Sequence, residues 1–534
     1  MTAATLAQRS TTRLPRIRLT EHVSGAVGLV AVLGVWWLAS ATIFASAGTV
    51  PSPGAVISGM LDDGWALYGP NVAITAETAL QGFLWGTIFA VLTALIVTII
   101  PALETLATSV SVISYCTPLL ALGPLILVVF GGSTPSVFLA AISVYFTTMI
   151  SSLNGLKSAD PQSLELVSVY GGGRFAQLCR IRLVSSLPHL FAAMKIAAPA
   201  AVLGAILGEY LGGVDIGIGV SLTAAQSSFE IARAWGMAVA AGLLAGLGYA
   251  LFAALQKLVL RYLFADGKAT VSTSSPTNTS HRRPALTFLT QIFAAAAIVV
   301  VAWIGFLSLF PQVSGRVGRN PSDVAHYLSD SSARSVVMAN LRVTALDSVI
   351  GFTAGMVAAL LVACAFIVLP ALRGTIMPVA TLLRAIPLVA LAPLIVLVFG
   401  RGVTTVAVLG GMVVFFPALV IIATGLAAAP RSALDVAFAY GAGRWTQLRM
   451  VSLPSAVPSV LVAARMSVPA ALVGALIAEW LGTGEGLGSS MIKAIPAFDY
   501  DQLWASISAI IGVSVLAYGL VGTIEHAVAR RMAG

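Results

Sequence analysis

The chain has 534 residues, of which 58% are hydrophobic and only 9% are charged, against about 25% charged residues in ordinary soluble domains. A soluble chain of this length cannot hide that much apolar surface from water, so the composition excludes a soluble globular protein. The net charge of +9 indicates no nucleic-acid partner, because Lys and Arg collect on the cytoplasmic loops of membrane proteins.

The chain begins with a basic segment, residues 1–22, which precedes the apolar stretch 23–47. This stretch is longer than the 7–15 apolar residues of a cleavable signal peptide, so we expect a retained first helix. Because about 20 apolar residues span a bilayer, the sequence predicts an all-α integral membrane protein with about 12 transmembrane helices. They are expected near 23–47, 74–100, 105–130, 135–153, 190–211, 235–260, 285–310, 341–369, 374–399, 403–425, 460–481 and 503–526.

The two halves of the chain repeat each other. The segment from Pro118 to Gly131 matches Pro387 to Gly400 at an offset of 269 residues, and Glu209 matches Glu479 at an offset of 270. Each half has six spans, an even number, so the repeat is parallel rather than inverted. The predicted divisions are a cytoplasmic segment (1–22), a first transmembrane domain (23–265), a cytoplasmic linker (266–284) and a second transmembrane domain (285–534).

The charged residues favour cytoplasmic N- and C-termini. Lys and Arg gather in the head of the chain, in 157–182, in 261–283 and in 431–449, whereas most acidic residues fall on the opposite side. Some basic residues lie on the acidic side against this trend. They are Arg233, Arg316, Arg319, Arg334 and Lys493.

One cytoplasmic segment in each half has a character of its own. Asp160-Pro161 predicts the N-cap and first turn of a short helix that ends at the glycines after Tyr170. Ala429-Pro430-Arg431 opens the equivalent helix, and a second short helix is expected over Arg174–Val184 and over Arg444–Val451. Amphipathic helices on a membrane surface show a similar pattern, but two copies at matching places favour a docking element used in pairs.

These segments share a spaced motif. Glu165 precedes Gly171 by six positions and Arg174 follows it by three, and the second half repeats this with Asp435, Gly441 and Arg444. Followed by Leu-Pro, this pattern resembles the "EAA" loop of permease subunits of binding-protein-dependent ABC importers. Further segments are similar to the nitrate, sulfonate and taurine branch of that family. They are Arg384-Ala-Ile-Pro387, Leu391-Ala-Pro393, Phe415-Phe416-Pro417 and Ala478-Glu-Trp-Leu481.

The resemblance implies a type I ABC importer-like permease fold in a bacterial plasma membrane. It implies two ATP-binding cassette ATPase partners, which bind the ATP and Mg, an extracytoplasmic substrate-binding protein, and no cofactor on this chain. The cargo would be a small anion such as nitrate, a sulfonate or taurine, and a pyrimidine-type vitamin precursor stays open. The ATPase-coupling residues would be Glu165, Gly171, Arg174, Asp435, Gly441 and Arg444.

The sequence departs from the family pattern at two positions of these loops. Asp435 stands where the pattern prefers glutamate, and Val184 replaces the proline that the second half has as Pro454. The first-half loop is therefore expected to dock less tightly, and the halves need not contribute equally.

Ionisable residues at membrane depth are candidates for the substrate pathway, because they usually face protein or water. Arg384, whose counterpart is Tyr115, and Arg401 would give the pathway a positive lining suited to an anion. Snorkelling or local pairing is the structural alternative, and it suits the symmetric residues Glu209 and Glu479 better. Lys195 and Arg465 form a further symmetric pair.

The sequence offers little support for an enzyme. Gly267-Lys268 lacks the rest of a Walker A motif, so ATP hydrolysis is expected on partner subunits. The three cysteines and five histidines are dispersed without metal-ligand spacing. A twelve-helix secondary transporter is the main alternative, since it also has two parallel halves. Such carriers have a basic loop between their second and third spans, whereas here that link is only Pro101–Glu104.

Overall fold

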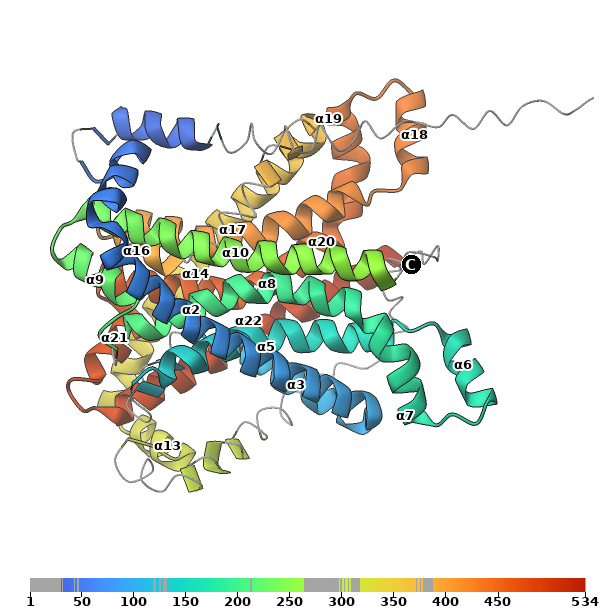
Figure 1. The fold of residues 1–534 in the computed structure, drawn as a ribbon, viewed down its shortest axis with the longest axis horizontal. Coiled ribbons are helices and arrows are strands. Elements are labelled where there is room, and N and C mark those ends of the chain that lie inside the picture. The colour runs from blue at the N-terminus through green and yellow to red at the C-terminus, as the bar shows by residue number, and fades with distance from the viewer. Residues whose placement is uncertain are drawn as a thin grey trace, which may run out of the picture.

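The computed structural model of the chain is built from helices over the residues that it describes (Figure 1). These are residues 48–118, 132–211, 214–263, 317–370 and 388–533, with scattered positions at 30–45, 122–127, 297–308 and 372–377. The predicted segments 1–22 and 266–284 lie outside them, so those domain boundaries stay predictions.

Eight helices of the described part are long and apolar enough to cross a membrane, and they confirm eight of the predicted spans. In the first half these are α2 (Pro53–Ile99), α5 (Thr134–Lys157), α8 (Leu183–Tyr210) and α10 (Ile231–Leu263). In the second they are α14 (Ser331–Val368), α17 (Val403–Ala427), α20 (Leu453–Ala478) and α22 (Tyr500–Ala533).

The other four predicted spans, 23–47, 105–130, 285–310 and 374–399, fall partly outside the described residues. Helix α3 (Glu104–Cys116) is the described start of the third span and ends before Pro118. Helix α16 (Leu388–Phe399) is the described end of the ninth span. The shorter elements are η1 (Pro101–Leu103), α6 (Pro161–Val169), α7 (Arg174–Gln177), η2 (Leu178–Arg182), α9 (Ile218–Ser227), α13 (Pro321–Ser329), α18 (Arg431–Ala439), α19 (Arg444–Gln447), η3 (Leu448–Ser452), η4 (Glu479–Thr483) and α21 (Gly486–Ala494).

Helix α2 corrects the predicted start of the second span. It begins at Pro53 rather than near residue 74, and Gly64, with φ 65° and ψ −177°, kinks it. The prediction followed the charge-free run that begins after Glu77, whereas the helix extends back through Glu77 and Asp63 to Pro53. The Asp63 carboxylate lies 2.6 Å from the Arg233 guanidinium, and this pairing lets the helix continue past an acidic residue.

Small residues set the packing of the transmembrane helices. A Cβ on Gly86 would lie 2.4 Å from the Ala141 carbonyl oxygen, between α2 and α5. A Cβ on Gly355 would lie 2.6 Å from the Gly411 carbonyl oxygen, between α14 and α17. Because lipid supplies no hydrophobic drive between helices, association depends on such close backbone approach. Both halves use it at matching positions.

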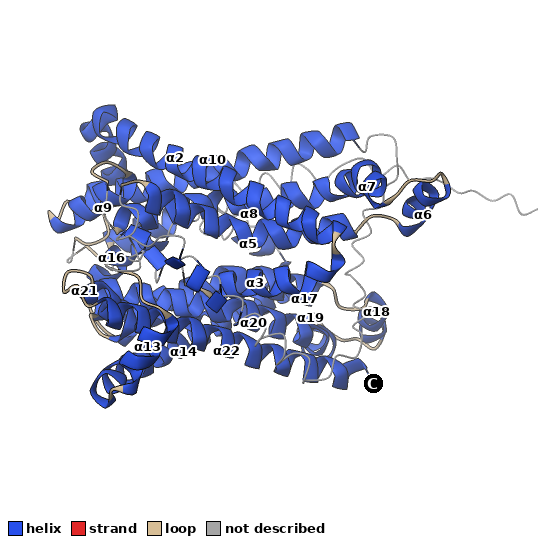
Figure 2. Ribbon diagram, turned by 90° about the horizontal axis from the view of Figure 1, so that it is seen from below, coloured by secondary structure: helices blue, strands red, loops and turns tan. Residues whose placement is uncertain are grey.

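The apolar core joins the two halves at one end of the bundle. There a single cluster contains Leu207 and Ile218 of the first half together with Leu476 and Trp504 of the second. Toward the end that carries α6 and α18, the core divides into one cluster around Met149 and another around Leu419. The halves therefore meet at the α9/α21 end and are packed separately at the α6/α18 end (Figure 2).

Contacts across the halves follow a two-fold relation. Tyr210 and Trp480, which are equivalent at an offset of 270 residues, meet edge to face with ring centroids 5.6 Å apart. Helix α3 of the first half packs against α20 and α22, and α16 of the second half packs against α9 and α10. Each half therefore has a helix that packs against the other half.

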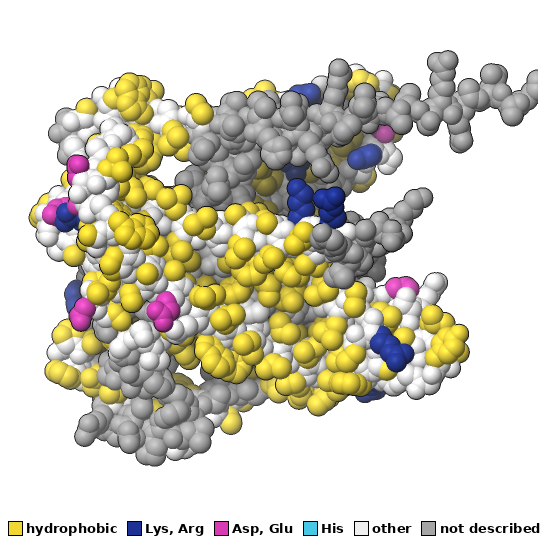
Figure 3. All heavy atoms as spheres, in the orientation of Figure 1, with side chains coloured by type: hydrophobic (Ala, Val, Ile, Leu, Met, Phe, Trp, Pro, Cys, Tyr) yellow, Lys and Arg dark blue, Asp and Glu magenta, His cyan; other side chains and the backbone are white. Residues whose placement is uncertain are grey.

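Charged residues separate toward the two ends of the bundle. Hydrophobic side chains cover the middle of the visible face, and most visible Lys and Arg lie toward the α6/α18 end (Figure 3). Three of the basic residues that run against this trend have partners at the α9/α21 end. Arg233 pairs with Asp63 and Glu230, Arg319 lies 2.6 Å from Asp501, and the Lys493 Nζ donates to the Gly484 carbonyl. Arg316 lies outside the described residues.

Replacement of Gly355 by leucine should destabilise the bundle, because the side chain would collide with the backbone of α17. Overpacking of this kind costs about 1–3 kcal/mol, so the thermal unfolding midpoint in detergent should fall by several degrees. Gly246→Leu in α10 is the control, since a Cβ there meets nothing within 4 Å. Equal midpoints for the two variants would contradict the packing argument.

Candidate functional site

Two matching hairpins project from the same end of the bundle. Helices α6 and α18 lie beyond the ends of the transmembrane helices, on the side that also carries the C-terminus (Figures 1 and 2). The predicted second short helix, Arg174–Val184, is wrong as a separate element. Residues from Arg174 to Tyr210 form one helix, because no glycine or proline between 174 and 187 ends it.

The predicted start of α6 is confirmed. The Asp160 side chain accepts hydrogen bonds from the backbone N–H groups of Gln162 and Ser163, at 3.4 and 3.1 Å. The Ser163 hydroxyl also donates to it at 2.8 Å, and these bonds hold the pKa of Asp160 below its ordinary value. Pro430, the matching residue before α18, makes no side-chain cap. The two hairpins therefore begin differently.

The glycines that end the two short helices are needed for their backbone conformation and not for close packing. Gly171 has φ 76° and Gly441 has φ 78°, and a Cβ on either would meet nothing within 4 Å. Both adopt the left-handed conformation that glycine reaches without strain. The close approach within the first hairpin is made one residue later, at Gly172.

The two residues that make this approach differ in side-chain size between the hairpins, and the two differences offset each other. A Cβ on Gly172 would lie 2.5 Å from the Val167 Cγ1. In the second hairpin the equivalent residues are Ala442 and Ala437. Both pairs keep the same backbone bond, Gly172 N–H to the Val167 carbonyl at 2.8 Å and Ala442 N–H to the Ala437 carbonyl at 3.0 Å. In the second hairpin the side chain at 442 is larger than that of Gly172, and the side chain at 437 is smaller than that of Val167.

The predicted coupling residues lie on the outer surface of these hairpins. Glu165 and Asp435 are exposed on α6 and α18, and Arg174 and Arg444 are exposed at the first positions of α7 and α19. Large apolar side chains are exposed beside them, although they project beyond the membrane-spanning helices. These are Leu166, Val169, Tyr170 and Phe175 in the first hairpin and Val436, Phe438, Tyr440 and Trp445 in the second. Exposed apolar patches of this kind mark protein-binding surfaces.

The missing loop proline leaves the backbone unchanged. Each hairpin passes through a π-helical turn, η2 or η3, into its transmembrane helix. Leu183, which precedes Val184, has φ −61° and ψ −45°, and Leu453, which precedes Pro454, has φ −64° and ψ −50°. The two hairpins therefore have the same geometry at this point, and the expectation of looser docking finds no support in the backbone.

Glu209 and Glu479 are buried at the α9/α21 end, where each carboxylate meets the start of a helix. Glu209 accepts from the Thr75 hydroxyl at 2.7 Å and from the Gly219 N–H at 2.8 Å. Glu479 accepts from the Gly488 N–H at 2.7 Å. A carboxylate at a helix N-terminus satisfies unpaired N–H groups and the helix dipole. These two acids stabilise the architecture, as their symmetry suggested.

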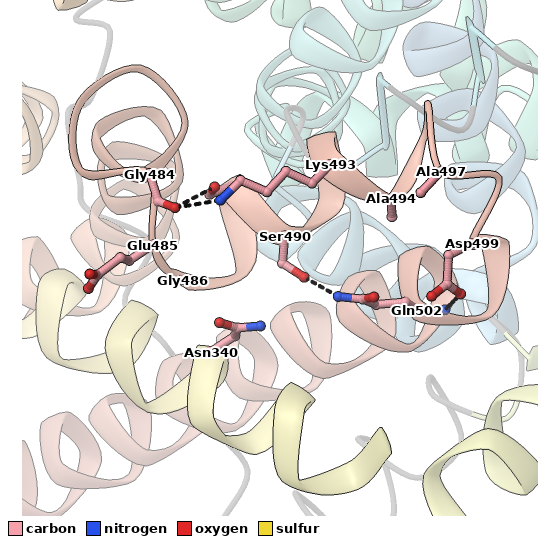
Figure 4. Close-up of a pocket in the computed structure, with 11 residues that line it drawn as sticks. Asn340, Gly484, Glu485, Gly486, Ser490, Lys493, Ala494, Ala497, Asp499 and Gln502 are labelled. Atoms are coloured by element: carbon pink, nitrogen blue, oxygen red, sulfur yellow. Dashed lines mark hydrogen bonds between the residues drawn. The ribbon is translucent and has the colours of Figure 1, made fainter. Parts of the chain in front are cut away.

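Beside Glu479 the second half has a polar cavity of about 300 Å³. Asn340, Ser490 and Gln502 line it, and Gln502 donates to the Ser490 hydroxyl at 2.7 Å (Figure 4). In the first half Asn71, the counterpart of Asn340, accepts from the Gly217 N–H at 2.9 Å. Asn340 makes no such bond to its own loop and borders the cavity instead.

Four of the five candidate pathway residues are described, namely Tyr115, Arg401, Glu209 and Glu479, and their environments differ. Tyr115 lies between the halves, where its hydroxyl donates to the Met466 carbonyl at 2.7 Å and its ring stacks on Phe146 at 4.3 Å. Arg401 is exposed in the bend between α16 and α17. Arg384 lies outside the described residues.

The ion pair between Arg465 and Glu525 was not predicted from the sequence. The Arg465 guanidinium lies 3.1 Å from the Glu525 carboxylate, and it also lies over the Tyr518 ring, 5.4 Å from its centroid. Arg465 had been noticed only as the counterpart of Lys195. The signal for its partner was Glu525 itself, the acidic residue that directly follows the charge-free stretch of the last span.

Comparisons with known proteins find the same family in both halves of the chain. The family model described as "Binding-protein-dependent transport system inner membrane component" matches residues 79–264 and again residues 338–534. The two matches correspond to the two halves of the bundle. No solved structure matches the chain significantly.

Curated relatives are permeases named for several solutes. The chain is 30% identical over 181 residues, 34% of its length and 72% of the relative's, to a probable ABC transporter permease protein of Haemophilus influenzae. It is 31% identical to the riboflavin transport system permease protein RibX of Chloroflexus aurantiacus, over 30% of this chain and 59% of that one. It is 29% identical to the taurine transport system permease protein TauC of Escherichia coli, over 28% and 54%.

The offsetting side-chain sizes in the two hairpins predict a coupled effect. Gly172→Ala alone should destabilise the first hairpin, because its new Cβ would overlap the Val167 side chain. Val167→Ala should relieve this by reproducing the second hairpin, and the coupling should amount to about 0.5–3 kcal/mol. Hydrogen exchange of α6 in the two single variants and the double variant measures it. Simple additivity of the two substitutions would be the contrary result.

Proposed function

The chain belongs to the family of binding-protein-dependent transport system inner membrane components and is an ABC transporter permease component, and we propose that its halves enclose one pathway for ATP-driven import. In this proposal one ATPase subunit docks on α6 and a second on α18. The observation that carries it is the presence of two hairpins of matching geometry at one end of the bundle, with exposed acids, arginines and aromatic side chains.

The α6/α18 end faces the cytoplasm in this proposal, and both termini lie there. The basic residues concentrated in the two hairpins support this orientation, since Lys and Arg are enriched on the cytoplasmic side. Basic residues at the other end are paired with Asp63, Glu230 and Asp501. The α9/α21 end then receives the substrate-binding protein, and the cavity beside Asn340 opens on that side.

The division of the apolar core suggests how ATP could drive transport. Because the halves share a core only at the α9/α21 end, the α6/α18 ends can approach or separate without breaking that core. ATPase subunits that close on each other would draw α6 and α18 together. The pathway would then alternate between cytoplasmic and outer access, with the contact between Tyr210 and Trp480 near its outer closure.

We propose a small anion as the cargo, with nitrate, sulfonates and taurine as the first candidates. The support is the motif resemblance together with a relative that is named for taurine. A pyrimidine-type vitamin precursor is the alternative, and one relative is the formylaminopyrimidine transport permease protein ThiX of Halalkalibacterium halodurans. Family membership disfavours a secondary transporter, because it links the chain to permeases that work with ATPase and binding-protein partners.

Gly441→Val tests the docking role of the hairpins. Valine at φ 78° is strained by about 1–2 kcal/mol, so the end of α18 should shift. We expect normal membrane insertion with about tenfold weaker co-purification of the ATPase and lower ATP-dependent uptake, since 1.4 kcal/mol is a factor of ten.

Gly443→Val is the matched control for this test. Gly443 has φ −67° and open space around its Cβ, so valine adds bulk there without strain. Uptake that is unchanged in Gly441→Val would contradict the proposed coupling role. Equal losses in both variants would assign the effect to bulk on the surface rather than to the backbone.

A further inference from the structure

Two equivalent places at membrane depth differ in their charge. In the second half, Arg465 of α20 is paired with Glu525 of α22 at 3.1 Å and lies over the Tyr518 ring. A positive charge inside a membrane protein is costly unless it is paired. The carboxylate of Glu525 offsets that cost, so the second half is neutral here.

The first half keeps the cation and the tyrosine but lacks the acid. The counterparts of Arg465, Tyr518 and Glu525 are Lys195, Tyr249 and Gln256. The Gln256 amide donates to the Pro188 carbonyl at 3.3 Å, so it is used to join α10 to α8. Among the described residues no hydrogen bond or ion pair involves Lys195, which is partly buried. Within the described part of the chain, its charge therefore has no acidic partner at this depth.

The position of Lys195 is at the boundary between the halves. In the second half this face of α20 and α22 meets the first half, because the Tyr518 and Tyr115 rings lie 6.5 Å apart. The repeat places Lys195 and Tyr249 on the corresponding face of α8 and α10. Helix α16 of the second half packs against α10, so α10 also lies against the other half. A pathway between the halves would therefore pass this lysine.

We propose that Lys195 is the cation of an anion-binding site in the transport pathway, and that Glu525 closes the equivalent site in the second half. An ionisable residue inside a membrane protein usually faces a partner or a substrate route, and here no residue that the structure describes supplies an acidic partner. The ligand is a small anion with one accessible negative group, such as nitrate or an alkyl sulfonate. This inference rests on the proposed function, since it names the cargo class of the same pathway.

Anion-dependent thermal stability of the purified full chain in detergent tests the site. Sodium nitrate and sodium methanesulfonate are titrated at constant ionic strength held with sodium gluconate. A ligand that binds only the folded state raises the unfolding midpoint with a saturable dependence on concentration. We expect such a rise in the wild-type protein for at least one of the two anions. No saturable rise with either anion would overturn the inference.

Two variants should abolish the rise by opposite routes. Lys195→Met removes the cation, and Gln256→Glu keeps it but installs the counter-ion that the second half has. Each should weaken the apparent anion affinity at least tenfold. The double variant Arg465→Met/Glu525→Met is the matched control, because removal of both members of a pair leaves no unpaired charge. It should retain the anion effect.

The variants also differ in stability without the anion, which gives a readout independent of binding. Lys195→Met should unfold at the same or a higher temperature than the wild type, because it removes an unpaired charge. Arg465→Met alone should unfold at a lower temperature, because it leaves Glu525 unpaired. A retained anion effect in Gln256→Glu, or its loss in the double control, would overturn the assignment to Lys195.

Failure of this inference can be told apart from failure of the proposed function. Co-purification of ATPase subunits and ATP-dependent uptake test the permease, and they do not depend on the anion titration. A permease that binds its ATPases but shows no anion effect at Lys195 would refute only the site. Uptake that needs no ATPase would refute the proposed function whatever the titration shows.

Discussion

The structure depends on one constraint of the bilayer, which is that polar and charged groups at membrane depth must find their partners within the protein. Glu209 and Glu479 meet it by binding the N–H groups at the starts of α9 and α21. Arg465 meets it through Glu525. Each of these contacts joins a transmembrane helix to another element, so satisfying the polar groups also fixes the arrangement of the helices. Lys195 has no ionic partner among the residues that the structure describes.

The internal repeat makes such departures informative, because each half serves as a reference for the other. Gly172 and Val167 are replaced by Ala442 and Ala437 with the same backbone bond, so this difference is compensated locally. The change from Glu525 to Gln256 has no such compensation among the described residues. The first kind of difference preserves a shared structure, whereas the second is the basis of the proposed anion site.

Much of the site could be predicted from the sequence because its signals are local. Asp160-Pro161 and the glycines at 171 and 441 carry the capping chemistry of short helices, and the structure has α6 and α18 where this chemistry predicts them. The second short helix was wrong because its continuation into α8 depends on the absence of a stop signal, which is weaker evidence than the presence of one. The expectation at Val184 also depended on an absence, that of the proline found at Pro454. The residues before these two positions, Leu183 and Leu453, have the same conformation, so the absence leaves the backbone unchanged.

The sequence by itself determined the membrane class, the parallel repeat, most of the spans and the paired hairpins, since hydrophobic length, periodic similarity and capping residues act over short distances along the chain. Only the tertiary structure decided which charges are paired and where the halves meet. Arg465 and Glu525 are far apart in sequence, as are Tyr210 and Trp480. Such partners are chosen by helix packing across the bundle, and no local pattern of residues encodes that packing.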